Sequence, residues 1–541
     1  MNDYRTWLKK TKEYPDLYNE LTSIKDNEDA INDRFYRELE FGTGGLRGVI
    51  GAGTNRMNVF TVGRATLGLG DYLSESNSPK SVVIAYDSRN MSTEFARRSA
   101  EILSSFGITV YLFDKITPTP VLSYAVRYLK AGAGIVITAS HNPKEYNGYK
   151  VYNENGCQIT DDSARTITQK IKARGYFDAY EKREDLINIV GDEILNTYVS
   201  TIKKLSLFDG AENYAPKVVY TPLHGTGNIP VRRILSEIGI QNVTVVNEQE
   251  LPDGSFTTCP YPNPEEKDAL ELAIKLGNEN GAELVLATDP DADRIGIAVR
   301  NNRGEFVLLN GNETGMLIMD YMLARKREEG TLGSHPVVIK TIVSTDIAFS
   351  IAKKYGATVK EVLTGFKYIG EAMDTIDNFV MGMEESYGYL VGQHARDKDA
   401  VSAAMIICEM YAYYKKSGLS LYDKLLQIYS EHGTYVTDLV SKTYKGASGA
   451  EKMKEIIASI RSNPTISYKN EKFVFTDFKQ GIDGLPKSDV LRFKSKNIRV
   501  IIRPSGTEPK IKIYFQVSAD NESVAKSILA EIKDTVQGIL D

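Results

Sequence analysis

Short apolar runs alternate with amphipathic segments along most of the chain. SVVIAYDS (81–88), ITVYLFD (108–114) and AGIVITAS (133–140) have the length and β-branched content of buried strands. The segment 92–106, between the first two runs, has the apolar spacing of a helix. Strands that alternate with helices in this way predict an α/β domain.

The same plan restarts twice further along the chain. A second unit runs from KVVYTPLHG (217–225) to AELVLATDPDADR (282–294). A third begins with a helix at 312–325 and continues through HPVVIKTIVSTD (335–346) and ATVKEVLTG (357–365). In each unit an apolar strand ends in a polar loop, and ligands of open α/β sheets bind at the carboxyl ends of strands.

The two ends of the chain differ from these units. Residues 1–40 are polar with helical spacing and predict an N-terminal helical cap without chemistry, whereas IRVIIRPSG, KIKIYFQVS and a helix at 521–539 predict a separate α+β domain. We therefore expect an α/β protein with three consecutive similar α/β domains of mixed sheets, and a C-terminal α+β domain, around a central cleft. The expected domains are 1–206, 207–309, 310–421 and 422–541.

Composition limits the classes of function. The 541 residues are 42% apolar and 25% charged, as in an ordinary globular protein, and the net charge of −5 argues against a nucleic-acid partner. The N-terminus lacks the apolar region of a signal peptide, and the longest near-apolar stretch (400–414) is too short to span a membrane and contains Glu409. The three cysteines form no CxxC pair. We expect a cytoplasmic protein with a small-molecule partner, no membrane contact and no obligate protein partner.

The first loop of chemical interest is TASHNPKEYNGYK (138–150). An apolar strand leads to Ser140 on a turn rich in Asn, Pro and Gly, where we expect the hydroxyl to be exposed. A serine nucleophile needs activation, and His141 and Lys150 could supply a base or a charge. The alternative is a surface turn in which Ser140 bonds to its own backbone.

The second loop, TDPDADRIG, places Asp289, Asp291 and Asp293 at alternate positions directly after an apolar strand. Three such carboxylates repel one another unless a cation neutralises them, and hard oxygen ligands suit Mg²⁺, Mn²⁺ or Ca²⁺. An EF-hand would need glycine and an acidic residue where Arg294 and Arg300 stand. The loop predicts a divalent metal site, with a solvated acidic turn as the alternative.

The third loop, MGMEESYGYL, holds Glu384, Glu385 and Ser386 after an apolar run. Carboxylate and hydroxyl groups can bind sugar hydroxyls, although helix-capping acids give the same pattern. The fourth, RPSGTEPK (503–510), combines a guanidinium with hydroxyls and backbone N–H groups. It predicts a phosphate clamp that needs no metal, or else a plain β-turn.

Motifs typical of nucleotide-binding proteins and of serine hydrolases are missing from the sequence. FGTGGLRG (41–48) has neither the G-K-[ST] ending of a P-loop nor the spacing of GxGxxG, so neither ATP nor NAD is expected. Ser140 does not stand in a G-x-S-x-G elbow, which argues against a serine hydrolase.

TASHNP, DPDADR, EESYG and RPSGTEPK, in that order and preceded by GTGGLRG, resemble the motifs of the α-D-phosphohexomutase superfamily over nearly the whole chain. The resemblance implies that Ser140 carries a phosphoryl group and that one Mg²⁺ per chain is bound by Ser140, Asp289, Asp291 and Asp293. It assigns the phosphoserine loop, the metal loop, the sugar loop and the phosphate clamp to the four expected domains in turn.

The resemblance also implies roles for single residues. Arg47 and Arg294 match active-site arginines, and His141, Lys150 and Lys398 match positions near the reacting oxygens. The sugar and the non-reacting phosphate would be bound by Thr364, Gly365, Glu384, Ser386, Arg503, Ser505, Gly506 and Thr507. Met383 replaces the usual Gly of GEES, and no histidine follows SYG. The general acid or base therefore stays open, with Lys398 favoured.

The implied reaction interconverts a hexose 1-phosphate and a hexose 6-phosphate through a sugar 1,6-bisphosphate, which is both intermediate and activator. TGFKYIG (364–370) resembles the specificity loop of the family and favours glucose, ahead of mannose and pentose. The alternative from a different class is a non-catalytic protein that binds phosphosugars.

Overall fold

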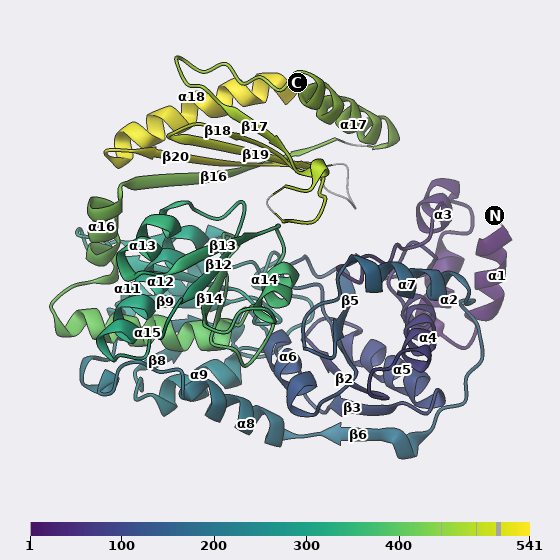
Figure 1. Cartoon of the computed structure of the whole chain (residues 1–541). Helices are drawn as coiled ribbons and strands as arrows, with labels where there is room; N and C mark the ends of the chain where they lie inside the picture. Colours follow the sequence, from purple (N-terminus) through teal and green to yellow (C-terminus); the bar gives the residue numbers. More distant parts are fainter. Residues whose placement is uncertain (1, 445, 483, 505–509, 541) are drawn as a thin grey trace.

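The computed structural model describes residues 2–444, 446–482, 484–504 and 510–540. The chain forms four sheets in sequence order, and Figure 1 shows the fourth lying above the third, with the first at the opposite end of the molecule. The first three sheets are mixed and the fourth is antiparallel. The predicted fold class is confirmed.

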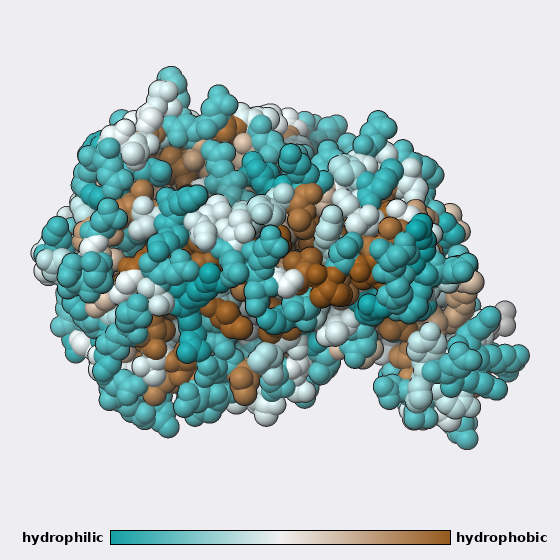
Figure 2. Space-filling model, turned by 90° about the horizontal axis from the view of Figure 1, so that it is seen from below, coloured by the Kyte–Doolittle hydropathy of each residue, from teal (hydrophilic) through white to brown (hydrophobic). Residues whose placement is uncertain are grey.

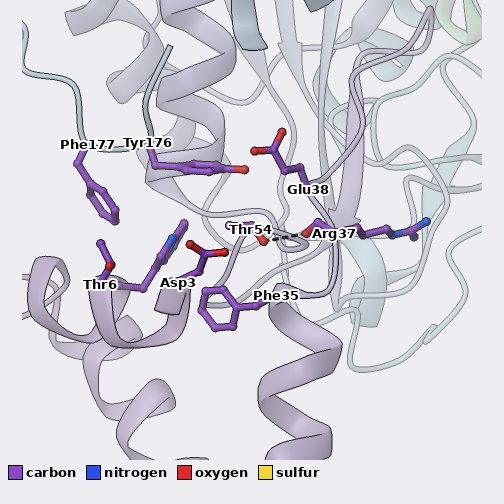
Figure 3. A pocket seen from close by; sticks show the side chains of 9 residues that line it. Asp3, Thr6, Phe35, Arg37, Glu38, Thr54, Tyr176 and Phe177 are labelled. Atoms are coloured by element: carbon purple, nitrogen blue, oxygen red, sulfur yellow. Dashed lines mark hydrogen bonds between the residues drawn. The ribbon is translucent and has the colours of Figure 1, made fainter. Parts of the chain in front are cut away.

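The N-terminal helices are α1 (Asn2–Lys10), α2 (Pro15–Ser23) and α3 (Glu28–Phe35). Trp7 is buried and contacts Phe35, Phe60 and Tyr176 edge to face, which fixes these helices on the first sheet's domain. A hollow of about 320 Å³ lies beside Trp7. Figure 3 shows Phe35, Tyr176 and Phe177 among the side chains that line it. Of its two carboxylates, Asp3 and Glu38, the second is paired with Arg64 at 2.7 Å.

The first sheet has the order β1-β5-β4-β2-β3-β6. Its strands are β1 (Leu46–Val49), β2 (Ser81–Tyr86), β3 (Thr109–Phe113), β4 (Ala133–Ile137), β5 (Tyr146–Asn153) and β6 (Ile187–Val190). Alternate residues of β2 enter different cores: Val82 and Ile84 pack against helices on one face of the sheet, whereas Val83 and Ala85 pack against helices on the other face. Both faces are covered, which explains the continuous apolar runs in the sequence. The helices are α4 (Val59–Glu75), α5 (Ser92–Ser105), α6 (Thr119–Tyr128), α7 (Asp161–Lys172) and α8 (Asp192–Lys203).

The second sheet has the order β11-β10-β9-β7-β8. Its strands are β7 (Val218–Thr221), β8 (Val243–Val245), β9 (Leu284–Thr288), β10 (Ile295–Arg300) and β11 (Phe306–Leu309), and its helices are α9 (Asn228–Glu237), α10 (Asn247–Glu250) and α11 (Glu271–Asn280). The aspartate run lies in the tight turn between β9 and β10, which pair antiparallel.

The third sheet has the order β13-β12-β14-β15. Its strands are β12 (Val337–Thr341), β13 (Thr358–Val362), β14 (Phe379–Glu384) and β15 (Gly388–Val391). Its helices are α12 (Gly311–Glu328), α13 (Ile347–Tyr355), α14 (Phe366–Met373), α15 (Ala400–Lys416) and α16 (Leu421–His432). α15 packs against both α9 and β15, so it is buried nearly all round, as its near-apolar sequence requires. Within the described part of the chain, no helix is long and apolar enough to cross a membrane.

The fourth sheet has the order β16-β20-β19-β18-β17. Its elements are β16 (Thr434–Thr443), α17 (Gly446–Ser462), β17 (Val474–Asp477), β18 (Leu491–Lys494), β19 (Ile498–Pro504), β20 (Lys510–Ala519) and α18 (Glu522–Leu540). Val500 and Ile502 pack with α17 and α18. Figure 1 shows both helices on the outer face of the fourth sheet. Ile501 joins Val343 and Leu363 of the third domain. The fourth sheet is thereby seated over the carboxyl end of β12.

The surface seen from below in Figure 2 is mainly hydrophilic, with hydrophobic residues in small scattered groups. The apolar material of the sequence is concentrated in cores between sheets and helices, the largest of which joins the first three sheets. The loops at the strand ends of different sheets are consequently held against one another.

Candidate active site

The serine loop after β4 meets the aspartate loop after β9. Ser140 Oγ donates a hydrogen bond to Asp289 Oδ2 at 2.8 Å, and it lies 3.2 Å from Nδ1 of His141. The packing of the first two sheets brings together two loops that lie far apart in the sequence. The hydroxyl and the carboxylates can therefore act on the same group.

Ser140 is only 4% exposed, so the expectation of an exposed hydroxyl was wrong. The turn itself is as expected, but the loop of Asp289 covers it. The backbone of Ser140 is left-handed, with φ of 54°, a conformation that costs a non-glycine residue roughly 1–2 kcal/mol. A hydrogen bond of 2.8 Å from Ser140 N to Thr138 Oγ1 stabilises this turn.

The carboxylates of Asp289, Asp291 and Asp293 are buried, and one oxygen of each lies within 4.8 Å of the others. Asp291 Oδ1 and both carboxylate oxygens of Asp293 accept no hydrogen bond from any described residue. Burial, together with the charges of the other two carboxylates, raises the pKa of Asp289 well above its ordinary value. Unsatisfied hard oxygens at this spacing fit a divalent cation such as Mg²⁺.

Two lysines from other sheets face the same carboxylates. Lys150 Nζ, on β5, lies 2.8 Å from Asp291 Oδ2 and 3.6 Å from Asp293 Oδ2. Lys398 Nζ, just before α15, lies 3.1 Å from Asp293 Oδ2. The negative charge of the triad is thus partly offset by cations that also stand beside Ser140's loop.

The predicted arginines lie around His141. Arg47 lies on β1, opposite Gly148 of β5 in the strand pairing. Arg294 follows the aspartate run, and its Nη1 donates a hydrogen bond of 2.5 Å to Glu265 Oε1. Burial, followed by the charges of Arg294 and Arg47, holds the pKa of His141 well below its ordinary value. The imidazole is therefore neutral near pH 7.

The sugar loop joins this group through backbone contacts. Ile295 N donates to Tyr387 O at 3.1 Å, which ties the aspartate loop to the turn between β14 and β15 that also holds the partly buried Ser386. Glu384 is buried at the end of β14, and its Oε1 accepts a hydrogen bond of 2.9 Å from Gly365 N. The loop that begins at Gly365 and the loop that holds Glu384, both predicted to bind the sugar, are therefore in direct contact.

A cavity of about 290 Å³ lies where the first, third and fourth domains meet. It is lined by Thr43, Gly44, Gln158, Asp161, Thr364, Gly365, Lys367, Tyr368, Ser488, Val490 and Arg503. Arg503, on β19, is the predicted clamp residue that the structure describes. Ser505, Gly506 and Thr507 lie outside the described residues.

Some polar residues of the site were missed in the sequence. Thr119 Oγ1 donates to Asp291 Oδ2 at 2.8 Å, and Thr119 N donates to Asp291 O at 2.9 Å. Lys367 lines the cavity and pairs with Asp161 at 3.3 Å. Thr119 opens a helix with no motif to mark it, but Lys367 stands within TGFKYIG and could have been included as a cation beside Gly365.

The fold and the converging loops are those of the α-D-phosphohexomutase superfamily. Four domain descriptions match in order: the phosphoglucomutase/phosphomannomutase alpha/beta/alpha domains I (38–176), II (196–304) and III (310–429), and the C-terminal domain (449–534). The chain belongs to the phosphoglucomutase/phosphomannomutase family and is an enzymatic mutase, an isomerase of phosphohexoses.

Relatives agree over nearly the whole length. The chain is 38% identical over 520 residues to a phosphoglucomutase of Staphylococcus haemolyticus, covering 91% of this chain and 93% of the relative. It is 35% identical over 558 residues to one of Staphylococcus aureus, covering 98% of each.

Among solved structures, the Paramecium phosphoprotein pp63/parafusin, a phosphoglucomutase in its open form, has a TM-score of 0.71 at 19% identity, covering 93% of this chain and 96% of that one. A phosphoglucomutase/phosphomannomutase family protein of Burkholderia thailandensis has a TM-score of 0.69 at 18% identity, covering 92% and 97%. These structural likenesses support the fold.

Proposed function

We propose that the protein is a phosphoglucomutase that interconverts glucose 1-phosphate and glucose 6-phosphate, with Ser140 as the phosphoryl carrier and glucose 1,6-bisphosphate as intermediate. The observation that carries the proposal is the 2.8 Å contact between Ser140 Oγ and the buried carboxylate Asp289. Relatives named phosphoglucomutase support glucose as the sugar.

The transfer requires charge and alignment. Phosphorylated Ser140 gives its phosphoryl group to a sugar hydroxyl, so the new P–O bond forms as the P–Oγ bond breaks and the hydroxyl proton leaves. Mg²⁺, which Asp289, Asp291 and Asp293 would hold with Ser140, supplies Lewis acidity when bound. Lys150, Arg47 and Arg294 offset the charge of the transferred oxygens.

Proton transfer is divided between two residues. When Ser140 takes a phosphoryl group from the sugar, neutral His141, 3.2 Å from Ser140 Oγ, would accept the Oγ proton, and protonated Lys398 would give its proton to the sugar oxygen that the phosphoryl group leaves. When phosphorylated Ser140 gives its phosphoryl group to the sugar, His141 would return the proton to Oγ and Lys398 would take up the proton of the sugar hydroxyl. These roles follow from the charge state of each side chain. They need no histidine after SYG, where this sequence has none. The return step uses the same groups in the opposite direction.

The rest of the substrate would be held at and beside the cavity of about 290 Å³, which Thr364, Gly365 and Arg503 line. Thr364, Gly365, Glu384 and Ser386 would bind the sugar hydroxyls, and Arg503 would bind the phosphate that does not react, together with Ser505, Gly506 and Thr507. Since the intermediate carries two phosphates, it can reorient within the site and place either phosphate next to Ser140. The clamp also helps to exclude water, which would hydrolyse the phosphoserine.

The test compares the parent with Ser140→Ala and with Ser99→Ala, a control that removes a different buried hydroxyl, on α5. We expect glucose 1,6-bisphosphate to add one phosphate to the parent, located by peptide mass spectrometry at Ser140. Ser140→Ala should take up none and should lose roughly 10³-fold or more in kcat, whereas Ser99→Ala should behave as the parent.

The same assay identifies the sugar. Turnover of glucose 1-phosphate, mannose 1-phosphate and ribose 1-phosphate is compared through kcat/KM, and the largest value should belong to glucose. Binding of phosphosugars without turnover of any of them would identify the non-catalytic alternative. Full activity of Ser140→Ala would refute the phosphoserine route.

A further inference from the structure

Arg89, in the segment that follows β2, donates hydrogen bonds to the serine loop. Its guanidinium is buried, with the residue 3% exposed, and it donates four hydrogen bonds to backbone carbonyl oxygens. Nη2 donates to Ser140 O and Asn142 O, each at 2.5 Å, while Nη1 donates to Pro143 O at 2.9 Å and Tyr146 O at 3.1 Å. One side chain thus binds the loop from its serine to the start of β5.

Arg89 is itself held in place. Asp87 is 1% exposed, and its Oδ2 lies 3.2 Å from Arg89 Nε. Its Oδ1 accepts hydrogen bonds from Arg89 N at 3.0 Å and from Ser92 Oγ at 2.8 Å. The ring of Phe256, from the second domain, lies 4.8 Å from the guanidinium carbon. A buried ion pair with so many fixed contacts has little freedom to move.

The serine loop needs such an anchor. Ser140 has the left-handed backbone that side chains disfavour, and four carbonyl groups of the loop converge on one guanidinium, the one of Ser140 through a buried hydrogen bond and the other three through partly buried ones. Buried carbonyl groups are costly without donors. The planar guanidinium fork satisfies four of them at once, which the single ammonium of a lysine, with three donors, cannot do.

We propose that Arg89, oriented by Asp87, is a positioning residue that sets the backbone of the serine loop and so fixes the place of Ser140 Oγ. Among the described residues, its side chain donates hydrogen bonds to backbone carbonyl groups and pairs with Asp87, and no hydrogen bond joins it to the carboxylates of Asp289, Asp291 or Asp293. The inference rests on the proposed role of Ser140, since only then does the place of Oγ limit the reaction rate.

The test uses Arg89→Lys, Asp87→Asn and a matched control, Arg64→Lys. Arg64 is also buried, donates to the carbonyl oxygens of Ile171 and Arg174 at 3.1 and 2.7 Å, and pairs with a carboxylate, but it lies on α4 away from the serine loop. For each variant we measure the melting temperature, kcat, the Kd for glucose 1-phosphate by calorimetry, and the rate of phosphate transfer from glucose 1,6-bisphosphate to Ser140.

We expect Arg89→Lys to lose about 100-fold in kcat and in the rate of Ser140 phosphorylation, the scale of a misplacement of about 1 Å. Asp87→Asn leaves the arginine present and should lose about ten-fold. The Kd for glucose 1-phosphate should change less than about three-fold in both, because the clamp and the sugar loop are untouched.

The role of Arg89 is refuted if Arg89→Lys keeps the kcat of the parent, or if Arg64→Lys loses as much kcat for the same drop in melting temperature. If Arg89→Lys does not fold, Asp87→Asn becomes the test. An unchanged rate of Ser140 phosphorylation in Asp87→Asn would then refute the inference. Ser140→Ala is assayed alongside. If it stays active, the proposed function fails, whereas an inactive Ser140→Ala with a fully active Arg89→Lys overturns only the positioning role.

Discussion

Lys398 Nζ lies 3.1 Å from Oδ2 of Asp293, so the segment before α15 supplies a counter-charge to the aspartate turn of the second sheet. Burial by itself lowers the pKa of Lys398, but the carboxylates of Asp293 and Asp397 outweigh it and raise this pKa above its ordinary value. Lys398 is therefore protonated at neutral pH and suited to donate a proton.

Lys398→Met should lower kcat by about 10²- to 10⁴-fold, the range for removing a general acid. The parent should show no loss of kcat/KM on the basic side below pH 9, because Lys398 keeps its proton there. Lys415→Met, which removes a lysine paired with Glu283 at 2.8 Å, is the control and should stay active. A normal kcat for Lys398→Met would remove this lysine from the reaction.

Asp291→Asn replaces a charged candidate metal ligand by a neutral one and also weakens the contacts to Lys150 and Thr119. We expect the Mg²⁺ concentration for half-maximal activity to rise at least about ten-fold, since ligand charge sets the affinity. Calorimetric titration with Mg²⁺ gives the same shift independently of activity. A parent enzyme that keeps full activity in excess chelator would show that the carboxylates serve no metal.

Arg503→Ala removes a charge-assisted contact worth roughly 1.5–3 kcal/mol, which corresponds to a loss of about ten- to a few hundred-fold in kcat/KM. Glucose 1-phosphate and glucose 6-phosphate should be affected alike, because each must place its existing phosphate in the clamp. Arg461→Ala, which breaks a surface pair with Asp477 on the same domain, is the control. A defect confined to one of the two sugars would place Arg503 at the reacting centre.

Glu385 makes the stability depend on pH. Burial, followed by the adjacent charge of Glu384, raises its pKa from 4.5 to about 7. The folded state then binds this proton more tightly than the unfolded state, so its contribution to stability is complete below pH 4.5 and is lost as the pH rises to about 7. Glu385→Gln should remove this loss, stabilising the protein by about 1–3 kcal/mol at pH 8.

The measurement for Glu385→Gln is urea unfolding at pH 5 and pH 8. The gain over the parent should be large at pH 8 and small at pH 5. Glu305→Gln, at an exposed position next to β11, is the control and should not alter the pH dependence. An equal gain at both pH values would contradict a proton bound by Glu385 in the folded state.

Much of this protein follows from local sequence. The apolar runs that ended at Ser140 and Asp289 identified β4 and β9 because buried strands need continuous apolar residues, and a polar residue directly after such a strand lies at the sheet edge. The segment 312–325 was predicted as a helix and lies within α12. The motif order alone was sufficient to recognise the superfamily.

Contacts between loops could not be predicted in this way. Ser140 is buried because the aspartate loop, 149 residues away, covers it, and no periodicity near Ser140 contains that information. Arg89 was missed for the same reason: its partners are backbone carbonyl groups, which carry no sequence signal.

The sequence by itself determined the sheets, the residue types at their edges and the family to which they belong, since these depend on local periodicity and short motifs. Only the tertiary structure decided that Lys398 faces Asp293 and that Arg89 binds the serine loop. The physical reason is that burial, charge pairing and pKa depend on which sheet edges pack together, and that packing is set by cores that join residues from all parts of the chain.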